Sequence, residues 1–358
     1  MLEDAITERV ERSINENVFP GCVIGLVDRN GARTVLPFGR HTYEDTSQIV
    51  HADTVYDLAS VTKSIPTASL ALALINAGSL HLHDRVSLHL PELRHDQGAT
   101  IEDLLRYRVH GVQLSKLHVR TFEEIRTHAL EHGFDGPPGE SVYTNLPAFI
   151  LGLVIERVGK ASIAELAHRY FFGPLAMEAT TYFPSPSDCA PTEIDGFDML
   201  TAGNRGPDSA PPSSKTTDGH GKASTGKEVR GLPHDESAYK FALARRSAGH
   251  AGLFSTAPDL LNFLESLLST NVGLTKSRIT AGASAGLGWQ TEGQFLGNHA
   301  SPGSFGKTGF TGTSVCLDPQ KGIALVILSN RTYPKRPINQ DAINGFRADI
   351  ADIVLTGA

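Results

Sequence analysis

The most constraining feature of the sequence is the placement of its strand and helix patterns. Short apolar and β-branched runs bounded by turn residues, typical of strands, occur near both ends of the chain. The expected strands cover residues 22–27, 34–38, 287–291, 306–317 and 323–328. Helical periodicity occurs in the middle of the chain and again at both ends. Helices are expected over 3–17, 60–78, 101–107, 122–132, 146–158, 162–172 and 337–355, and a further helix is expected to start at 255–259. The terminal strands can pair into one antiparallel sheet that packs against a mostly helical segment.

This order predicts an α+β fold with two lobes and a functional site in the cleft between them. The α/β lobe is expected to combine residues 1–57 with residues 283–358, and the mainly helical lobe is expected to cover 58–282. Residues 201–230 are rich in Gly, Ser, Thr, Pro and Lys and contain almost no apolar side chains. Because such a composition cannot bury a core, this segment is expected to be a flexible surface insertion.

One expected helix begins with Ser60 and Lys63, which are three residues apart. A helix places side chains at this spacing on one face, and an amine beside a serine hydroxyl can remove its proton and make it nucleophilic. The residues that follow are apolar nearly all round, so the helix should be buried, with Gly78 as its C-cap and a kink at Pro66. Ser-x-x-Lys arises often by chance, so this pair alone does not identify an enzyme.

Two further stretches carry side chains suited to the same chemistry. Tyr143 and Asn145 stand at the start of the helix expected over 146–158. A phenol near two ammonium groups can act as a base, and an amide can bind a substrate carbonyl. The alternative for this pair is a helix cap with a packed aromatic ring. Lys307 lies within a strand pattern and would add positive charge to the site, and its alternative is a solvated strand lysine.

Gly309 and Phe310, which follow Lys307 and Thr308 in the sequence, could also contribute to a reaction site. Gly309 would let a substrate approach the edge of the strand. The backbone N–H of Phe310 could pair with that of Ser60 to form an oxyanion hole.

Three short motifs thus follow one another along the chain. They are Ser60-x-x-Lys63, Tyr143-x-Asn145 and Lys307-Thr308-Gly309. In this order they resemble the motifs of the class C β-lactamase and penicillin-binding-protein superfamily, which includes the family VIII carboxylesterases. The segments 138–145, 249–256 and 309–319 also look like recurring segments of that family. The resemblance covers nearly the whole chain and implies the β-lactamase/transpeptidase-like fold.

The resemblance implies acyl transfer through an acyl-enzyme, without a metal or another cofactor. Ser60 would be the acylated nucleophile, Lys63 its proton partner and Tyr143 the general base. Asn145 would orient the substrate. Lys307 and Thr308 would bind the substrate carboxylate or stabilise charge on Tyr143. The predicted catalytic residues are Ser60, Lys63, Tyr143 and Lys307, and the predicted substrate-binding residues are Asn145, Thr308, Gly309 and Phe310.

Departures from the family pattern leave the substrate open. Residues 106–111 read Arg-Tyr-Arg-Val-His-Gly where the family often carries a His-Thr-Ser-Gly-like segment. Phe310 resembles the esterase-like members, whereas Lys307 resembles the lactamases and peptidases. We therefore expect a β-lactamase-like serine hydrolase with esterase activity. The alternatives are a cytoplasmic carboxylesterase or biosynthetic transacylase, and a non-catalytic ligand-binding module, against which the intact Ser60, Lys63 and Tyr143 argue.

Composition limits the partners and the compartment. The net charge of −7 argues against nucleic acid or an anionic membrane as the main partner. The partner that the family resemblance implies is a small-molecule acyl substrate (a β-lactam, amide or ester). Three distant cysteines make a disulfide framework unexpected. The N-terminal residues lack the pattern of a signal peptide and no apolar run is long enough to span a bilayer. The chain as written is expected to be cytoplasmic, or periplasmic or secreted if a leader was removed.

One further motif suggests a different hydrolase. Gly282-Ala-Ser284-Ala-Gly286 matches the Gly-x-Ser-x-Gly elbow of α/β hydrolases, which requires a buried strand before it and a helix after it. The sequence on either side offers neither element, so this segment is expected to be a loop.

Overall fold

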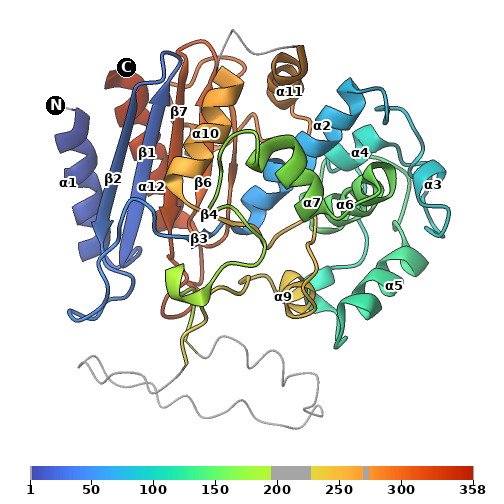
Figure 1. The fold of residues 1–358 in the computed structure, drawn as a ribbon, viewed down its shortest axis with the longest axis horizontal. Helices are drawn as coiled ribbons and strands as arrows, with labels where there is room; N and C mark the ends of the chain where they lie inside the picture. Colours follow the sequence, from blue (N-terminus) through green and yellow to red (C-terminus); the bar gives the residue numbers. More distant parts are fainter. Residues whose placement is uncertain (1, 195–226, 269–273, 358) are drawn as a thin grey trace.

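A five-stranded antiparallel sheet joins the two ends of the chain, as the strand patterns predict (Figure 1). The computed structural model of the protein describes residues 2–194, 227–268 and 274–357. The strands are β1 (Gly21–Asp28), β2 (Arg33–Gly39), β5 (Phe305–Thr308), β6 (Ser314–Asp318) and β7 (Ile323–Ser329). Their order across the sheet is β2-β1-β7-β6-β5, so the first strand pairs with the last, with Cys22 opposite Ser329.

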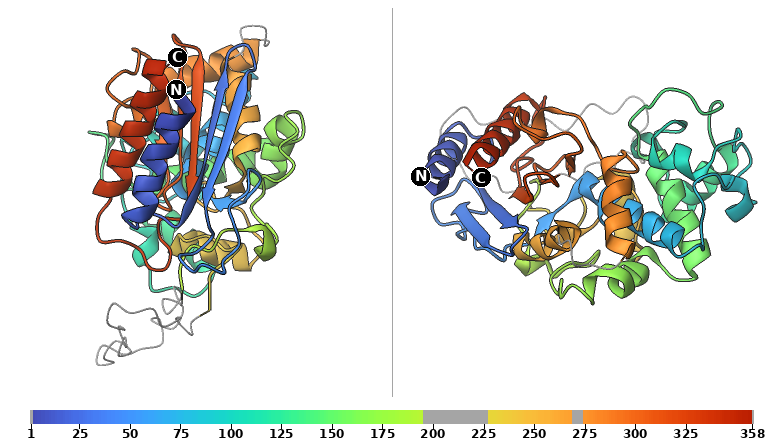
Figure 2. Two further views of the ribbon diagram at one scale, coloured as in Figure 1. Left: turned by 90° about the vertical axis from the view of Figure 1, so that its left-hand side faces the viewer. Right: turned by 90° about the horizontal axis from the view of Figure 1, so that it is seen from above.

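Helices cover both faces of this sheet. The two terminal helices, α1 (Leu2–Asn15) and α12 (Asp341–Gly357), pack against each other on one face (Figures 1 and 2). On the other face, α10 (Ala257–Leu268) packs against β1 and β7. The sheet is therefore the middle layer of the α/β part of the molecule.

The sequence of β1 explains why both of its faces are buried. Cys22 and Ile24 belong to the apolar core shared with α1 and α12. Val23 and Val27 belong to the larger core that includes α10. Successive side chains of a strand point to opposite faces, so a continuous apolar run such as this one can fill two cores at once.

The middle of the chain forms the helical part of the molecule, with α2 at its centre, in contact with α6 and α11. Its helices are α2 (Ser69–Asn76), α3 (Val86–His89), α4 (Ile101–Leu105), α5 (Phe122–His132), α6 (Leu146–Gly159), α7 (Ile163–Ala167), α9 (Glu236–Leu243) and α11 (Leu274–Ser284). A second sheet of two short strands, β3 (Tyr56–Asp57) and β4 (Phe254–Ser255), lies between the two parts (Figure 1).

The single strand predicted over 306–317 is wrong, because this segment is a hairpin. The chain turns between β5 and β6, where Gly309 N–H donates to Thr313 O at 2.7 Å and Gly312 N–H donates to Gly309 O at 3.2 Å. Gly312 has a φ of +106°, which a residue with a side chain rarely adopts. The glycine pattern thus marks a turn in the middle of the apolar run.

The strand predicted over 287–291 is also wrong. Only Gln290 makes a β-bridge there, and its partner is Gly306. Gly286 and Gly288 have φ angles of +75° and +76°, which interrupt an extended backbone. The preceding Gly-x-Ser-x-Gly segment was expected to be a loop, but α11 extends to Ser284. Since a helix rather than a strand precedes this serine, the segment is not a hydrolase elbow.

Apart from the helix predicted over 60–78, which is described with the site, the predicted helices are confirmed, most of them with shifted ends. The helix predicted over 162–172 is α7 followed by a wider π-turn over 168–172. The helix predicted over 337–355 begins only at Asp341. Just before it, the Asn339 side chain accepts the Asp341 backbone N–H at 3.2 Å and closes a local turn. The short helices α3 and α9 and the helix α11 have no counterpart in the prediction.

The other expectations from the sequence concern the lobe boundaries, the predicted insertion, the cysteines and membrane-spanning helices. The predicted lobe boundaries at 57/58 and 282/283 stay a prediction, and α10 packs on the sheet although it lies within 58–282. Most of the predicted insertion, 201–226, lies outside the described residues. The three cysteine thiols are free and buried. Within the described parts of the chain, no helix has both the length and the apolar character needed to cross a membrane.

Candidate active site

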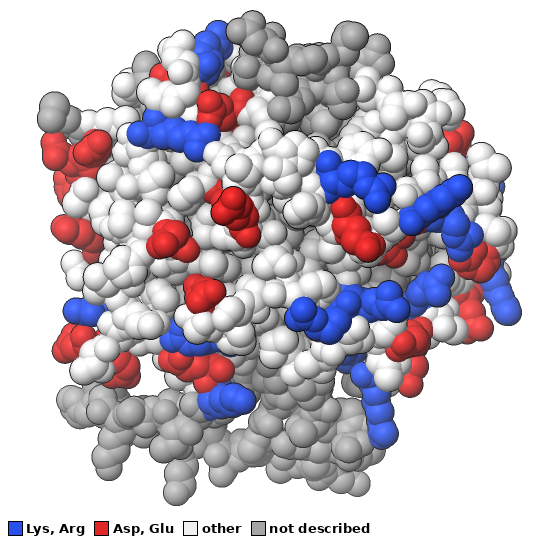
Figure 3. All heavy atoms as spheres, viewed as in Figure 1, with Lys and Arg blue, Asp and Glu red and all other residues white. Residues whose placement is uncertain are grey.

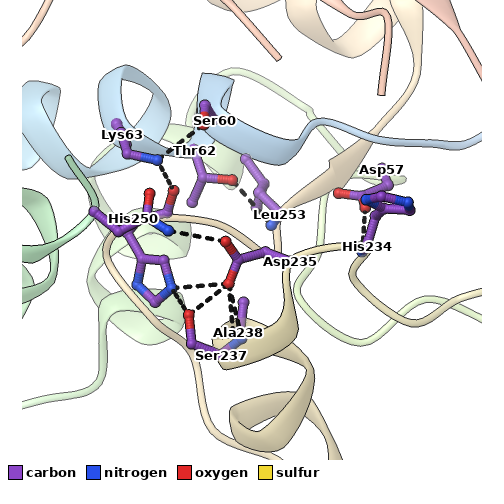
Figure 4. A network of polar contacts seen from close by, with 11 residues as sticks. Asp57, Ser60, Thr62, Lys63, His234, Asp235, Ser237, Ala238, His250 and Leu253 are labelled. Atoms are coloured by element: carbon purple, nitrogen blue, oxygen red, sulfur yellow. Dashed lines mark hydrogen bonds and ion pairs between the residues drawn. The ribbon is translucent and has the colours of Figure 1, made fainter. Parts of the chain in front are cut away.

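Ser60 and Lys63 lie in a single tight turn at the start of the helical part. Residues 59–63 form a 3₁₀ helix, in which side chains three apart are almost eclipsed. Lys63 Nζ donates to Ser60 Oγ at 2.9 Å and to the backbone oxygen of His250 at 2.7 Å (Figure 4). Lys63 is 1% exposed. The spacing therefore produces the predicted contact, although the turn is tighter than the expected α-helix.

The long helix predicted over 60–78 is broken, and the kink predicted at Pro66 is confirmed. Ile65 has φ −115° and ψ 107°, which is an extended conformation, because the residue before a proline is disfavoured in the helical region. The chain then passes through a π-turn into α2. Gly78, with a φ of +72°, ends that helix one residue beyond its cap. Ser60 thus sits on a short rigid turn rather than on a continuous helix.

Tyr143 lies between the two lysines of the predicted site. The centroid of its ring is 4.4 Å from Lys307 Nζ and 5.4 Å from Lys63 Nζ. Burial acts to raise the pKa of the phenol, but Lys63 and Lys307, together with hydrogen bonds to Ser60 and Lys63, hold that pKa below its usual value. Because 51% of Tyr143 is exposed, we regard desolvation as the weaker of these influences. A phenol with a depressed pKa can act as a base.

The surroundings of Lys307 lower the pKa of its ammonium group. Lys307 is 1% exposed, and burial lowers the pKa of its ammonium group to about 8, with Lys63 adding to the decrease and Tyr143 opposing it. The Lys307 Nζ atom also lies 5.1 Å from the ring centroid of Tyr107, and the two tyrosine rings are 5.3 Å apart. The alternative of a solvated strand lysine is therefore wrong. Tyr107, which the sequence reading did not single out, completes an aromatic cradle for this charge.

The turn that begins at Gly309 is fastened to the segment that precedes Ser60. Thr311 Oγ1 donates to Asp57 O at 2.6 Å, and Thr313 Oγ1 donates to Leu58 O at 3.0 Å. A Cβ atom on Gly309 would lie 2.4 Å from Leu58 O and 2.2 Å from Thr313 Oγ1, so no side chain fits there. The close approach that requires a glycine is an internal one, between β5 and the turn of Ser60.

The residues next to Gly309 are held by aromatic and cationic contacts. The Phe310 ring is stacked on the His234 ring, with the two centroids 5.5 Å apart. The guanidinium carbon of Arg331 lies 4.7 Å from the centroid of the Phe310 ring. The Thr308 backbone N–H donates to Gln290 Oε1 at 3.4 Å. The substrate-binding roles of Thr308, Gly309 and Phe310, and the oxyanion hole, remain predictions.

Asn145 has a partner that the sequence reading missed. Asn145 is the N-cap residue of α6, but its side chain does not cap that helix. Its Nδ2 donates instead to Asp235 Oδ2 at 3.0 Å, so the alternative of a side-chain helix cap is wrong. The other oxygen of Asp235 lies 3.2 Å from His250 Nε2. Burial acts to raise the pKa of Asp235, but His250, together with hydrogen bonds from Ser237 and Ala238, holds that pKa far below its usual value. The only signal in the sequence was an acidic residue suited to cap α9.

A buried acid also supports the nucleophile turn. Asp57 Oδ1 accepts the Ala59 backbone N–H at 2.9 Å. Asp57 Oδ2 accepts the His234 backbone N–H at 2.7 Å (Figure 4). Burial raises the pKa of Asp57 to about 6, against the lowering effect of these hydrogen bonds. The residue just before Ser60, Ala59, has a φ of +47°, which this carboxylate helps to hold.

A cleft of about 440 Å³ opens beside Tyr143 and Lys307, whereas Ser60, Lys63 and Asn145 are not among the residues that line it. Its walls include Tyr143, Lys307, Tyr107, Arg108, Trp289 and Gln290. Two larger hollows, of about 890 and 980 Å³, are lined by none of the predicted site residues. The lining of the first of these carries both basic and acidic side chains. Figure 3 shows one face of the molecule, on which Lys and Arg side chains are interspersed with Asp and Glu. The chemistry, rather than the size of the hollow, therefore marks the 440 Å³ cleft as the candidate site.

Comparison with known proteins gives consistent results. The model of the protein family described as "Beta-lactamase" matches residues 2–349. A protein of Salmonella agona named "Putative D-alanyl-D-alanine carboxypeptidase" is 27% identical, with 84% of this chain and 76% of that protein covered.

Solved structures match along the whole chain. A β-lactamase/D-alanine carboxypeptidase from Pseudomonas syringae has a TM-score of 0.72 at 18% identity, covering 100% of this chain and 99% of that one. EstCE1, "a hydrolase with promiscuous acyltransferase activity", has a TM-score of 0.71 at 19% identity, covering 99% and 98%. These matches confirm the predicted α+β fold of the β-lactamase/transpeptidase type.

Proposed function

Because the chain belongs to the β-lactamase family of serine hydrolases, we propose that Ser60 is its acylated nucleophile, Lys63 the hydrogen-bond and proton partner of Ser60, and Tyr143 the general base. The observation that carries this proposal is the contact of 2.9 Å between Lys63 Nζ and Ser60 Oγ, made by a lysine that is 1% exposed. A buried amine in contact with the hydroxyl is the arrangement that activates a serine.

In the first step, Ser60 Oγ attacks the carbonyl carbon of the acyl donor. The hydroxyl proton passes to Tyr143, whose pKa is depressed by Lys63 and Lys307. When the tetrahedral intermediate collapses, the bond to the leaving group breaks and the same proton goes to the departing nitrogen or oxygen. Water then attacks the acyl-enzyme, with Tyr143 again accepting and returning the proton.

We propose that Lys307 stabilises negative charge in this cycle and does not itself carry the proton. Its ammonium group stabilises the phenolate of Tyr143, and together with Thr308 it would receive a carboxylate on the substrate. Both roles require Lys307 to be protonated, which its pKa of about 8 allows at neutral pH. Asn145 is proposed to bind the acyl part of the substrate.

The proposed substrates are small β-lactam, amide or ester acyl donors. The carboxypeptidase name of the Salmonella agona relative adds peptides that end in D-alanyl-D-alanine to this list. A second candidate is acyl transfer to an alcohol or amine instead of water, which is proposed from the acyltransferase activity stated for EstCE1.

The test is intact-protein mass spectrometry after incubation with a penicillin, a cephalosporin and p-nitrophenyl butyrate, with Ser60→Ala in parallel. A β-lactam should add its full mass, because the leaving amine stays tethered, whereas the ester should add only its acyl group and release p-nitrophenol. Hydrolysis of a D-alanyl-D-alanine peptide and transfer to an added alcohol are measured in the same series.

The outcomes separate the proposals. An adduct or turnover with lactams that disappears in Ser60→Ala supports the lactamase and peptidase side. Turnover of the ester alone supports an esterase, and an ester product with the added alcohol supports a transacylase. If wild-type protein shows no adduct and no turnover with any of these compounds, the proposed function is wrong.

A further inference from the structure

Arg331, which follows β7, is a buried arginine whose hydrogen bonds to described residues end on neutral oxygens. It is 4% exposed. Its Nε atom donates to Phe310 O at 2.7 Å and its Nη1 atom donates to Asn339 O at 3.1 Å. The third nitrogen, Nη2, is buried and has no hydrogen-bond partner among the described residues. A charged group that is removed from water and keeps an unused donor is costly unless an anion or a water molecule reaches it.

A second buried arginine adds positive charge to the surroundings of the first. Arg347, on α12, is fully buried. Its hydrogen bonds in the described structure also end on neutral oxygens, those of Gly309, Thr313 and Asn344. Burial lowers the pKa of the Arg347 guanidinium to about 9, and the charge of Arg331 adds to the decrease. Like charges in a buried region repel each other, so an anion bound beside Arg331 would offset this repulsion.

Arg331 lines a hollow of about 380 Å³ between residues 16–18, at the end of α1, and the start of α12. None of the described residues that line this hollow also lines the 440 Å³ cleft. Its lining includes a second cation, Lys335, which is exposed. Glu16 is the only acid among the described residues of the lining, and it is exposed. The hollow therefore has a buried cation on one wall and an exposed cation at its edge.

The first turn of α12 adds backbone donors to the same hollow. Ala342 and Ile343 line it, in a helix of 17 residues that begins at Asp341. The first N–H groups of a helix have no acceptor within the helix, and the helix dipole favours an anion near them. The Asp341 N–H is taken by Asn339 Oδ1 at 3.2 Å, and the Asp341 side chain is exposed and outside the lining. The N–H groups of Ala342 and Ile343 have no acceptor among the described residues.

We propose that this hollow is a binding site for a small oxyanion, a carboxylate or phosphate group held by the Arg331 guanidinium, the Lys335 ammonium group and the first N–H groups of α12. A planar guanidinium matches the oxygens of such a group, and a helix N-terminus is a general site for them. Because Arg331 also binds Phe310 O, the site adjoins the turn that follows β5. The inference does not depend on the proposed function.

The test is isothermal titration calorimetry of the full chain with sodium phosphate and, separately, with sodium acetate. Sodium chloride keeps the ionic strength equal in all titrations, so that general screening does not enter the comparison. The wild type should bind one equivalent with a dissociation constant of about 1 mM, as expected for a few charge-assisted hydrogen bonds. Binding of phosphate alone identifies a site for phosphate groups, and binding of acetate identifies a site for carboxylates.

Variants at exposed positions locate the bound anion. Ala342→Glu places a carboxylate at the start of α12, where a helix tolerates negative charge, and should weaken binding at least about tenfold. Ala342→Gln is its matched control, with the same size and no charge, and should weaken binding less than about twofold. Lys335→Gln should weaken binding about threefold or more, whereas Lys116→Gln, which removes an exposed lysine of the helical part, should not change it.

The absence of saturable binding of either anion to the wild type up to about 20 mM overturns the proposal. A dissociation constant that is the same in the wild type, Ala342→Glu and Lys335→Gln also overturns it. If binding is lost in Lys307→Met but kept in Ala342→Glu, the anion occupies the 440 Å³ cleft and the proposal is wrong. Urea unfolding checks that each variant folds. Phosphate or acetate, whichever binds, should raise the urea midpoint of the wild type and not that of Ala342→Glu.

Discussion

Replacing Lys307 with methionine (Lys307→Met) should slow acylation of Ser60 mainly by raising the pKa of Tyr143. The Lys307 ammonium nitrogen lies 4.4 Å from the centre of the Tyr143 ring. Taken as the separation of two unit charges, this distance gives about 4 kcal/mol at an effective dielectric constant of 20 and about 1 kcal/mol in water. Because 51% of Tyr143 is exposed, a value of about 1–2 kcal/mol, or about one pKa unit, is appropriate.

The assay is the pH dependence of the acylation rate with a neutral ester, which keeps substrate charge out of the comparison. The phenolate of Tyr143 is the active form, so a higher pKa of Tyr143 lowers the acylation rate at every pH below that pKa. The acylation rates of the two proteins converge at pH values above both pKa values. The acid limb should therefore move up by about one pH unit, with a rate about tenfold lower at a pH on that limb.

A control variant keeps the total charge change equal. Arg12→Met removes one positive charge from α1, where Arg12 pairs with Glu8 on the exposed surface, and should leave the acid limb in place. The reasoning is refuted if the limb does not move in Lys307→Met, or if it moves equally in Arg12→Met. A loss of rate that is the same at all pH values would show that Lys307 acts on geometry and not on the phenol.

Three further predictions concern the framework of the site. Gly309→Ala should destabilise the protein by about 2–4 kcal/mol in urea unfolding, because its Cβ would clash with Leu58 O and the Thr313 side chain. An unchanged urea midpoint would contradict this. Arg347→Met should cost about 2–4 kcal/mol in the same assay, because buried Arg347 donates to Gly309 O at 2.7 Å and Thr313 O at 2.8 Å; a loss below about 0.5 kcal/mol would refute that role. The raised pKa of Asp57, about 6, means that the folded state binds this proton more tightly than the unfolded state, so its contribution to stability is lost as pH rises from about 4 to about 6. The free energy of unfolding of the wild type relative to Asp57→Asn should fall over that interval, and a flat difference would show that Asp57 does not titrate there.

Local spacing explains the parts of this protein that the sequence predicted well. Ser60 and Lys63 had to meet because any right-handed helical turn brings positions three apart together, whether it is α or 3₁₀. The apolar run over 22–27 predicted the strand β1 in the same local way, and the structure shows that all but the last of its residues are buried.

Contacts between distant segments explain what the sequence left open. Asp235 looks only like a helix cap until the fold places Asn145 on its second oxygen. The break at Ile65 was predicted from Pro66, but the tight turn that aligns Ser60 depends on Asp57 and His234, which come from different parts of the chain.

The sequence by itself thus determined which chemical groups the candidate site contains and in what order they occur along the chain: a hydroxyl, an amine, a phenol, an amide and a second amine. The tertiary structure decided the ionisation of those groups and the direction in which they point. Charge interactions and hydrogen bonds depend on distances and burial that arise only when the strands of both termini and the helical segment pack together. The depressed pKa values of Tyr143 and Lys307 and the orientation of Asn145 are therefore properties of the fold.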